Sequence, residues 1–341
     1  MKESKNILFT FDYELFLGAR SGSVQKCMLE PTQELLSIFD RYSIQQAIFF
    51  VDSTYLCRLK EMAQIHTAAK EDYNSIVKQV QEIIRKGHYV FPHLHPHWLD
   101  AIYSADKNSW QLTELRKYRF HALSEKERAE VMDSSIQILK EIILPVNPHY
   151  KLDGYRAGGW CIQPFGDFHP HFKKHEITTD FSVLKGMKNL STAQYYDFES
   201  APDKSVYKFE ENPALENKEG SFTEVAISVL EIPRFTQLMN KFWLKYLWKT
   251  GQRSWGDGNG VVAAKTEYSE AQKSNQEMVS LELINSIKLP LYKNYLKKNK
   301  LMHFISHPKM LSKHNLKSLA LFLKFATSRY HIQCDFRKLP E

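Results

Sequence analysis

The sequence has few cysteines and no long apolar run. Four cysteines lie far apart in its 341 residues, with no CxxC pair: Cys27, Cys57, Cys161 and Cys334. This spacing indicates neither a disulfide framework nor a thiolate zinc site. No run approaches the roughly 20 apolar residues that span a bilayer. Asp12 and Glu14 interrupt the apolar stretch near the N-terminus, which therefore fails as a signal-peptide core. We expect a cytoplasmic protein.

Acidic residues are missing from one long stretch. Residues 283–334 hold ten Lys or Arg and no Asp or Glu, in a chain whose net charge is +7. A basic charge this localised fits an anionic partner at one surface. No helix-turn-helix, RNP or zinc-finger pattern accompanies it, so we expect no nucleic-acid partner.

The composition is that of a globular chain, with 43% hydrophobic and 25% charged residues. Short apolar runs predict strands at residues 7–11, 47–51, 88–91, 176–183, 223–232 and 302–306. Helical periodicity lies between them, near 31–42, 70–86, 124–142, 236–250 and 313–327. The alternation favours an α/β fold with a parallel sheet, either doubly wound or closed into a barrel. We expect a single domain over residues 1–341, with loop insertions at about 186–222 and 251–275.

Three histidines lie within five residues in FPHLHPHW, just after a predicted strand. Alternate side chains share a face in a strand, whereas residues four apart share one in a helical turn. Because Pro96 favours a strand end near His93, we expect a turn that brings His93 and His97 onto one cation. His95 would then point elsewhere or into the cleft. The alternative is a polar loop of surface histidines.

Two acids end the first predicted strand. LFTFDYE runs from apolar residues into Asp12 and Glu14, which alternate to the same face. The carboxyl ends of parallel strands are where α/β folds place their active sites. Two histidines and one carboxylate form the open site of hydrolytic zinc enzymes, so one acid could bind a metal and the other accept a proton. The alternative is a turn with two solvated acids.

Two other predicted strand ends carry candidates. LDGYRAGGW delivers Arg156 to a glycine-rich turn, where its guanidinium could orient a carboxylate and the backbone could approach a ligand closely. FISHP places His307 after a strand, where its imidazole could protonate a leaving group. Taken alone, each residue could equally be structural.

In this order the four motifs resemble the polysaccharide deacetylase family, also called carbohydrate esterase family 4 or NodB-like, over about residues 5–325. TFDYE resembles its TFDD motif, GHYVFPHLHPH its GHEIxxHxxxH motif, YRAGG its RxPxG motif and FISHP its last motif. PTQELLSIFDRYSIQQAIFFVD also resembles the helix and second strand of that fold. Within the family, the chain is similar to the group of surface-polysaccharide and lipopolysaccharide O-antigen biosynthesis.

The resemblance implies a distorted (β/α)7 barrel and a divalent metal, zinc being expected and Co, Mn or Ni the alternatives. The metal-binding histidines of the family match His93 and His97. Tyr13 stands where the family has its metal-binding aspartate, so Glu14 becomes the third ligand and Asp12 the base. The roles of these two acids could be exchanged.

The other roles follow from the same resemblance. His307 is the general acid, and Arg156 positions Asp12 and lowers its pKa. A backbone N–H near Gly159 is a candidate for holding the oxyanion. YRAGG departs from the family's motif here, since it has Ala157 and Gly158 and lacks the proline. Asp180 would support Arg156 or His307, or serve as a buried structural acid. Two tryptophans are candidates for stacking on a sugar face or for simple packing: Trp98 and Trp160.

These roles predict hydrolysis of the N-acetyl group of an amino sugar in a glycan or glycan precursor. One alternative is a carbohydrate-binding protein on the same scaffold that no longer hydrolyses. The apparent base and acid argue against it, since binding needs neither. Another alternative is a deformylase or amidase of a different acylamino substrate.

The segment 239–255 combines basic and aromatic residues at helical spacing. Three lysines form one stripe: Lys241, Lys245 and Lys249. The neighbouring face holds Phe242, Trp243, Tyr246 and Leu247. This pattern suits a helix at an anionic membrane surface, where a lipid-linked precursor would be the substrate. The alternative is a barrel helix that buries its aromatics and solvates its lysines.

Overall fold

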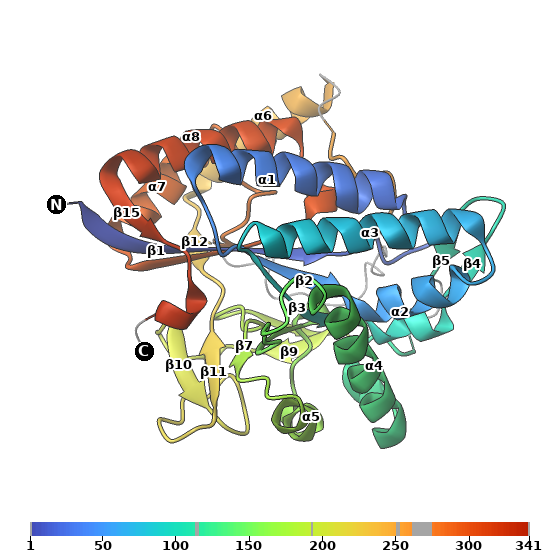
Figure 1. The fold of residues 1–341 in the computed structure, drawn as a ribbon. Helices are drawn as coiled ribbons and strands as arrows, with labels where there is room; N and C mark the ends of the chain where they lie inside the picture. Colours follow the sequence, from blue (N-terminus) through green and yellow to red (C-terminus); the bar gives the residue numbers. More distant parts are fainter. Residues whose placement is uncertain (1, 113–115, 192–193, 250–252, 261–274, 340–341) are drawn as a thin grey trace.

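The apolar runs of the sequence assemble into one curled sheet (Figure 1). The structure is a computed structural model that describes residues 2–112, 116–191, 194–249, 253–260 and 275–339. Along the sheet the strands are β10 (Val206–Phe209), β11 (Phe222–Val225), β7 (Thr179–Asp180), β6 (Gly154–Ala157), β3 (Tyr89–Leu94), β2 (Ile48–Asp52), β1 (Glu3–Tyr13) and β14 (Leu301–Ser306). β15 (Tyr330–Gln333) pairs with the start of β1. Neighbouring strands are parallel except for β10 and β11.

Irregular chain continues the curl between β7 and β14. The Ile227 N–H donates to the Val183 carbonyl, and the His303 N–H donates to Ser228 Oγ at 2.9 Å. Residues 226–228 therefore link the two sides of the curled sheet, as expected for a barrel-like α/β protein. Between β7 and β11, however, the described residues form the hairpin β8 (Lys188–Leu190) and β9 (Tyr195–Asp197), then β10. The regular seven-unit repeat is therefore not confirmed.

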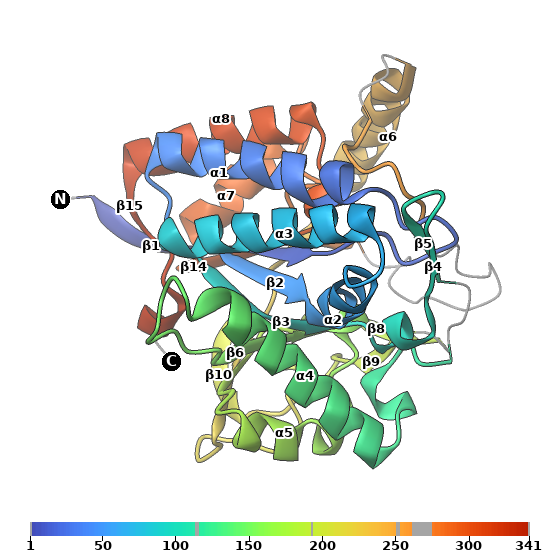
Figure 2. The ribbon, with the colours of Figure 1, turned by 45° about the vertical axis from the view of Figure 1, so that its right-hand side comes forward.

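Helices form the outer layer of the molecule (Figures 1 and 2). They are α1 (Glu30–Tyr42), α2 (Ser53–Met62), α3 (Thr67–Arg85), α4 (Glu125–Ile143), α5 (His169–Lys174), α6 (Arg234–Lys249), α7 (Leu289–Lys298) and α8 (Lys313–Arg329). α8 packs between α1 and α7, and α2 packs between α3 and α4. Within the described part of the chain, no helix combines the length and apolarity needed to span a bilayer.

The alternation of side chains along β1 separates an outer apolar layer from the inside of the curl. Phe9 and Phe11 pack outward on Phe39 of α1, with ring centroids 5.3 and 5.9 Å apart. Thr10 and Asp12 point the other way, toward the inside. This layering delivers polar side chains to the inside, at the carboxyl ends of the strands.

The predicted helices at 31–42, 70–86, 124–142, 236–250 and 313–327 are confirmed as α1, α3, α4, α6 and α8. The predicted strand at 176–183 is reduced to β7, and that at 223–232 divides into β11 and β12 (Val229–Glu231), which pairs with β13 (Gln276–Met278). A hairpin of β4 (Ile102–Ser104) and β5 (Ser109–Gln111) was not predicted, nor were α2, α5 and α7. The expected insertion 186–222 holds β8, β9 and β10, and most of 251–275 lies outside the described residues.

Candidate metal and catalytic site

The end of β1 brings two carboxylates to one place, as its alternation predicts. Asp12 and Glu14 are 5% and 4% exposed, and both face histidines at the carboxyl ends of β3 and β14. His93 Nε2 lies 3.9 Å from Asp12 Oδ2 and 3.4 Å from Glu14 Oε2. Two acids separated by one residue therefore share a buried polar cluster at the carboxyl ends of parallel strands.

Arg156 of β6 holds Asp12 in place. Its fully buried guanidinium donates to Asp12 Oδ1 at 2.8 Å and to Thr10 Oγ1 at 2.7 Å, while Nε donates to the Phe181 carbonyl at 3.0 Å. Burial alone would raise the pKa of Asp12, but the charge of Arg156, helped by nearby histidines, lowers it. The expected contact between Arg156 and Asp12 is thus present, and the positioning role stays a prediction.

His93 and His95 converge on Glu14. His95 Nε2 lies 2.7 Å from Glu14 Oε2 and 3.0 Å from His93 Nε2. His93 Nδ1 donates to the Arg156 carbonyl at 2.8 Å; since a carbonyl can only accept, this bond leaves the Nε2 lone pair of the neutral ring facing the cluster. One ligand atom from each of these three side chains lies within 4.8 Å of the others.

The three side chains fit a divalent metal. Among the described residues, Glu14 Oε2 has no hydrogen-bond donor although it is buried, and two imidazole nitrogens lie beside it. An unpartnered buried carboxylate oxygen is costly in an apolar surrounding. Two imidazoles and one carboxylate are the ligand set of open zinc sites that hydrolyse substrates. Glu14, His93 and His95 are therefore the candidate ligands.

The structure brings His95 to Glu14, whereas the sequence led us to expect His97 there beside His93. β3 continues to Leu94, and the backbone at His95 is not yet helical, with φ of −121° and ψ of 85°, so residues 93 and 95 share a side. The helical turn begins only at Pro96. His97 instead stacks on Tyr118, with ring centroids 5.1 Å apart, and burial lowers its pKa to about 3.

His307 follows β14 and completes the cluster. Its Nε2 lies 3.6 Å from Asp12 Oδ2 and 3.8 Å from Glu14 Oε1, while Nδ1 lies 3.3 Å from Glu282 Oε1. Burial disfavours the charged ring, but Glu282 and the other acids outweigh it and raise the pKa of His307 to about 9. The side chain is 21% exposed, more than any of the acids and histidines that it faces.

Two residues of the cluster were not predicted. Lys309 Nζ donates to Glu14 Oε1 at 2.7 Å and to the Leu15 carbonyl at 2.6 Å, although the residue is only 5% exposed. Burial opposes the ionisation of Glu14, but Lys309 and His95 hold the pKa of that carboxyl well below its usual range. Glu282 pairs with His307. Lys309 could have been suspected because it stands two residues after His307, in the sequence HPK. No comparable feature of the sequence pointed to Glu282.

Asp180 contacts neither Arg156 nor His307 in the hydrogen bonds that the structure describes. Its carboxyl accepts from the hydroxyl and the N–H of Ser182, at 2.8 and 3.2 Å. Burial raises the pKa of Asp180. Burial and the nearby Asp180 carboxyl also hold the pKa of Glu224 well above its usual range. The structural alternative for Asp180 is the one that these contacts support.

The glycine turn and the tryptophans occupy different environments. Gly159 adopts a left-handed φ of 58°, and a Cβ there would lie 3.1 Å from the Tyr118 ring. The following residue, Trp160, is half-buried beside Tyr196. Trp98 is fully buried and donates from Nε1 to Asp52 Oδ2 at 2.5 Å. Trp98 therefore packs, as its alternative allowed, and only Trp160 remains a candidate for contact with a sugar.

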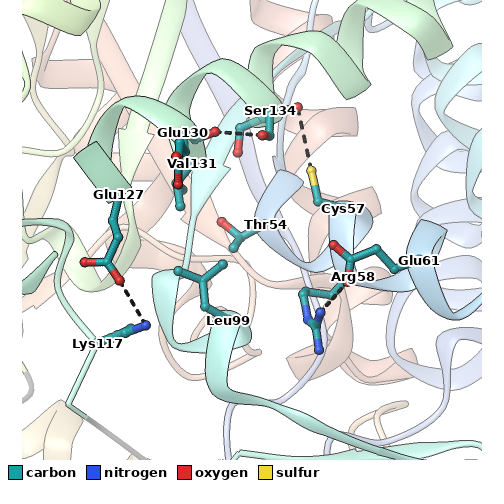
Figure 3. Close-up of a pocket in the computed structure, with 11 residues that line it drawn as sticks. Thr54, Cys57, Arg58, Glu61, Leu99, Lys117, Glu127, Glu130, Val131 and Ser134 are labelled. Carbon is teal, nitrogen blue, oxygen red and sulfur yellow. Dashed lines mark hydrogen bonds and ion pairs between the residues drawn. The ribbon is translucent and has the colours of Figure 1, made fainter. Parts of the chain in front are cut away.

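A separate cavity of about 360 Å³ lies between α2 and α4 (Figure 3). Its lining includes Thr54, Cys57 and Leu99, together with paired charges such as Lys117 and Glu127. None of the acids or histidines of the cluster lines it. We therefore place the candidate chemistry at the cluster and not in this cavity.

No protein-family model matches the sequence, and no curated protein matches it. Among solved structures, the fold is similar to a "putative polysaccharide deacetylase" from Mycobacterium smegmatis, with a TM-score of 0.50 and 12% identity, covering 98% of this chain and 87% of that one. It is also similar to the 4-alpha-glucanotransferase from Thermococcus litoralis, with a TM-score of 0.51 and 11% identity, covering 97% of this chain and 39% of that one. Likeness at such low identity establishes a shared fold, and the function has to be argued from the site.

Proposed function

We propose that the protein is a metal-dependent hydrolase that removes the N-acetyl group from an amino sugar of a glycan or glycan precursor. The convergence of Glu14, His93 and His95 beside Asp12 and His307 carries this proposal. A ligand set, a base and an acid are what metal-assisted amide hydrolysis needs. The likeness in fold to a protein described as a polysaccharide deacetylase and the four sequence motifs support it.

The metal site is assigned to Glu14, His93 and His95. Zinc suits two imidazoles and a carboxylate, and Co, Mn and Ni accept the same donors. When bound, such an ion polarises an acyl carbonyl and lowers the pKa of water. Lys309 shares the other oxygen of Glu14, which limits that carboxylate to one free oxygen.

Asp12 is assigned the base. Arg156 occupies its Oδ1 and favours the ionised form, so Oδ2 is the oxygen that accepts a proton from the attacking water. This contact favours the first of the two role assignments, in which Asp12 is the base and Glu14 the ligand. Arg156 acts through Asp12 and is therefore a positioning residue.

His307 is assigned the general acid. Its raised pKa of about 9 keeps the ring protonated at neutral pH, ready to donate a proton to the departing amine. Glu282 faces the second ring nitrogen and orients the imidazole. Gly159 and Trp160 stand on the turn after β6, where we assign a backbone N–H to the oxyanion and the indole to a sugar face.

The biological setting is part of the proposal. The resemblance of the motifs points to cytoplasmic biosynthesis of a surface polysaccharide or lipopolysaccharide. The substrate would then be a nucleotide-linked or lipid-linked amino sugar.

The test is incubation of zinc-loaded protein with nucleotide-linked and lipid-linked N-acetyl amino sugars, followed by mass spectrometry. We expect acetate and the free amine, and a rate at least ~100-fold lower for Asp12→Asn with its metal content unchanged. Release of formate from N-formyl analogues, without release of acetate from the N-acetyl sugars, would favour the deformylase alternative. Sugar binding without cleavage by the wild type would favour a binding protein.

A further inference from the structure

Helix α6 stands away from the other helices (Figure 2). It also exposes a stripe of apolar side chains. Phe235, Leu238, Met239 and Phe242 are 74%, 51%, 40% and 64% exposed. Their spacing of three, four and seven positions places them on one side of the helix. Four large apolar side chains exposed on one stripe exceed the scattered exposure that is normal for a protein surface.

A basic stripe runs beside the apolar one. Arg234, Lys241 and Lys245 are exposed, seven and four positions apart, and none of them has an ion-pair partner in the residues that the structure describes. The sequence of α6 contains no Asp or Glu. The expected stripe is thus present at residues 241 and 245, while the side chains of Tyr246, Leu247 and Lys249 lie outside the described residues.

The opposite side of α6 faces the body of the protein. Asn285 donates to Asn240 Oδ1 at 2.7 Å, and the Trp243 ring lies 4.3 Å from that of His314 at the start of α8. These contacts fix which way the helix faces. Trp243 is therefore held against the body, while the apolar stripe points outward.

A basic pocket of about 610 Å³ adjoins the helix. Its described lining consists of Lys26, Arg253, Ser254, Trp255, Lys313, His314 and Lys317, and none of these residues is acidic. Lys26 pairs with Glu30, whereas Lys313 and Lys317 are exposed and have no ion-pair partner among the described residues. His314 both lines the pocket and contacts Trp243, so the pocket lies next to α6.

We propose that α6 and this pocket dock the protein on an anionic lipid bilayer. The apolar stripe would enter the boundary between headgroups and acyl chains, and the flanking cations would contact lipid phosphates. A second copy of the chain fits less well, because pairing two α6 helices would bring like charges together. The proposal requires neither the metal nor hydrolysis.

The docking surface is joined to the candidate site through the backbone. The Trp255 N–H donates to the Leu311 carbonyl at 2.8 Å, and the Gly256 N–H donates to the Lys309 carbonyl at 2.9 Å. The wall of the basic pocket is thus bonded to the segment whose Lys309 holds Glu14. A bilayer-bound enzyme would present this segment near the lipid surface.

The test is cosedimentation of the full chain with phosphatidylcholine vesicles, with and without phosphatidylglycerol, at low and high salt. We expect binding to the anionic vesicles that high salt reverses. Lys241→Gln with Lys245→Gln should weaken it by roughly 30-fold, since each cation near an anionic surface adds about a factor of five. Phe235→Gln with Phe242→Gln should also weaken the binding at low salt, since it removes the side chains that enter the bilayer boundary.

Matched variants separate docking from net charge and apolarity. Lys70→Gln with Lys78→Gln removes two exposed charges from α3, and Ile65→Gln with Ile102→Gln removes two exposed apolar side chains; both should bind like the wild type. Equal binding to neutral and anionic vesicles, or none at low salt, would overturn the proposal. So would sedimentation-velocity runs showing a dimer that only Phe235→Gln with Phe242→Gln dissociates, without vesicle binding.

Discussion

His95 owes its place beside Glu14 to the backbone of one residue. Its non-helical backbone carries the alternation of β3 past Leu94, so the side chains at 93 and 95 point to the same carboxylate. Pro96 then starts the helical turn that sends His97 toward Tyr118. Which of the two histidines, His95 or His97, is the candidate metal ligand therefore depends on where the strand ends.

The metal content of two variants distinguishes these histidines. His95→Ala should lose most of the bound ion, because an open site with three protein ligands rarely survives with two. His97→Ala should retain it, since the ring lies outside the cluster. Elemental analysis after dialysis, with circular dichroism to confirm folding, is the measurement. Retention of the ion by His95→Ala together with loss by His97→Ala would restore the expected pair.

The buried side chain of His88 joins three elements of the fold. His88, just before β3, accepts a hydrogen bond at Nδ1 from the Ala47 N–H before β2, at 3.2 Å. Its ring lies between Phe39 of α1 and Phe49 of β2. One imidazole therefore ties a helix and two strands together, and it does so only in its neutral form, because a protonated Nδ1 cannot accept.

This contact predicts a stability that depends on pH. Burial lowers the pKa of His88 to about 4, below the 6.5 of the unfolded chain. Between these values the unfolded state binds a proton that the folded state does not, so stability falls as the pH drops through this window. At pH 5 the loss should be about 2 kcal/mol.

Urea unfolding of the wild type and His88→Asn at pH 7 and pH 5 measures this effect. The amide of asparagine can accept from the Ala47 N–H but does not titrate, so the variant should show a smaller loss at pH 5 than the wild type. The exposed His149→Asn is the control and should behave like the wild type. An equal loss in His88→Asn and the wild type would exclude this explanation.

The molecule as a whole has an aromatic end and a polar end inside its curled sheet. Phe336, near the C-terminus, packs on Tyr89, Phe91 and Phe181, with ring centroids 5.2 to 5.6 Å apart. Tyr89 begins β3, whereas His93 lies near the end of that strand. The aromatic cluster thus closes the amino ends of the strands, and the acids and histidines occupy the carboxyl ends.

Removal of the Phe336 ring should destabilise the whole protein. Phe336→Ala leaves a cavity among three aromatic rings and should cost about 3 to 5 kcal/mol in the free energy of unfolding. Leu321→Ala on the exposed face of α8 is the control, with an expected cost below about 0.5 kcal/mol. Chemical denaturation gives both values. A cost for Phe336→Ala as small as that of the control would mean that this end of the sheet is closed by other contacts.

The sequence by itself determined the features that follow from local periodicity. The alternation of LFTFDYE puts Asp12 and Glu14 on one face, and the helical spacing of residues 31–42 and 313–327 predicts α1 and α8. The exposed basic stripe of α6 at Lys241 and Lys245 was likewise visible in the spacing. These features need no distant partner, because the backbone geometry of a strand or helix sets which side chains share a face.

Only the tertiary structure decided the contacts between residues far apart in the chain. Lys309 and Glu14 are 295 positions apart, and nothing near either residue announces the pair. The choice of His95 over His97 likewise depended on where β3 ends against its neighbours. The sequence makes Trp98 a candidate for contact with a ligand, but its buried indole donates to Asp52. These contacts form only when the sheet curls and brings distant segments together. The local periodicity of the sequence does not specify how the sheet closes.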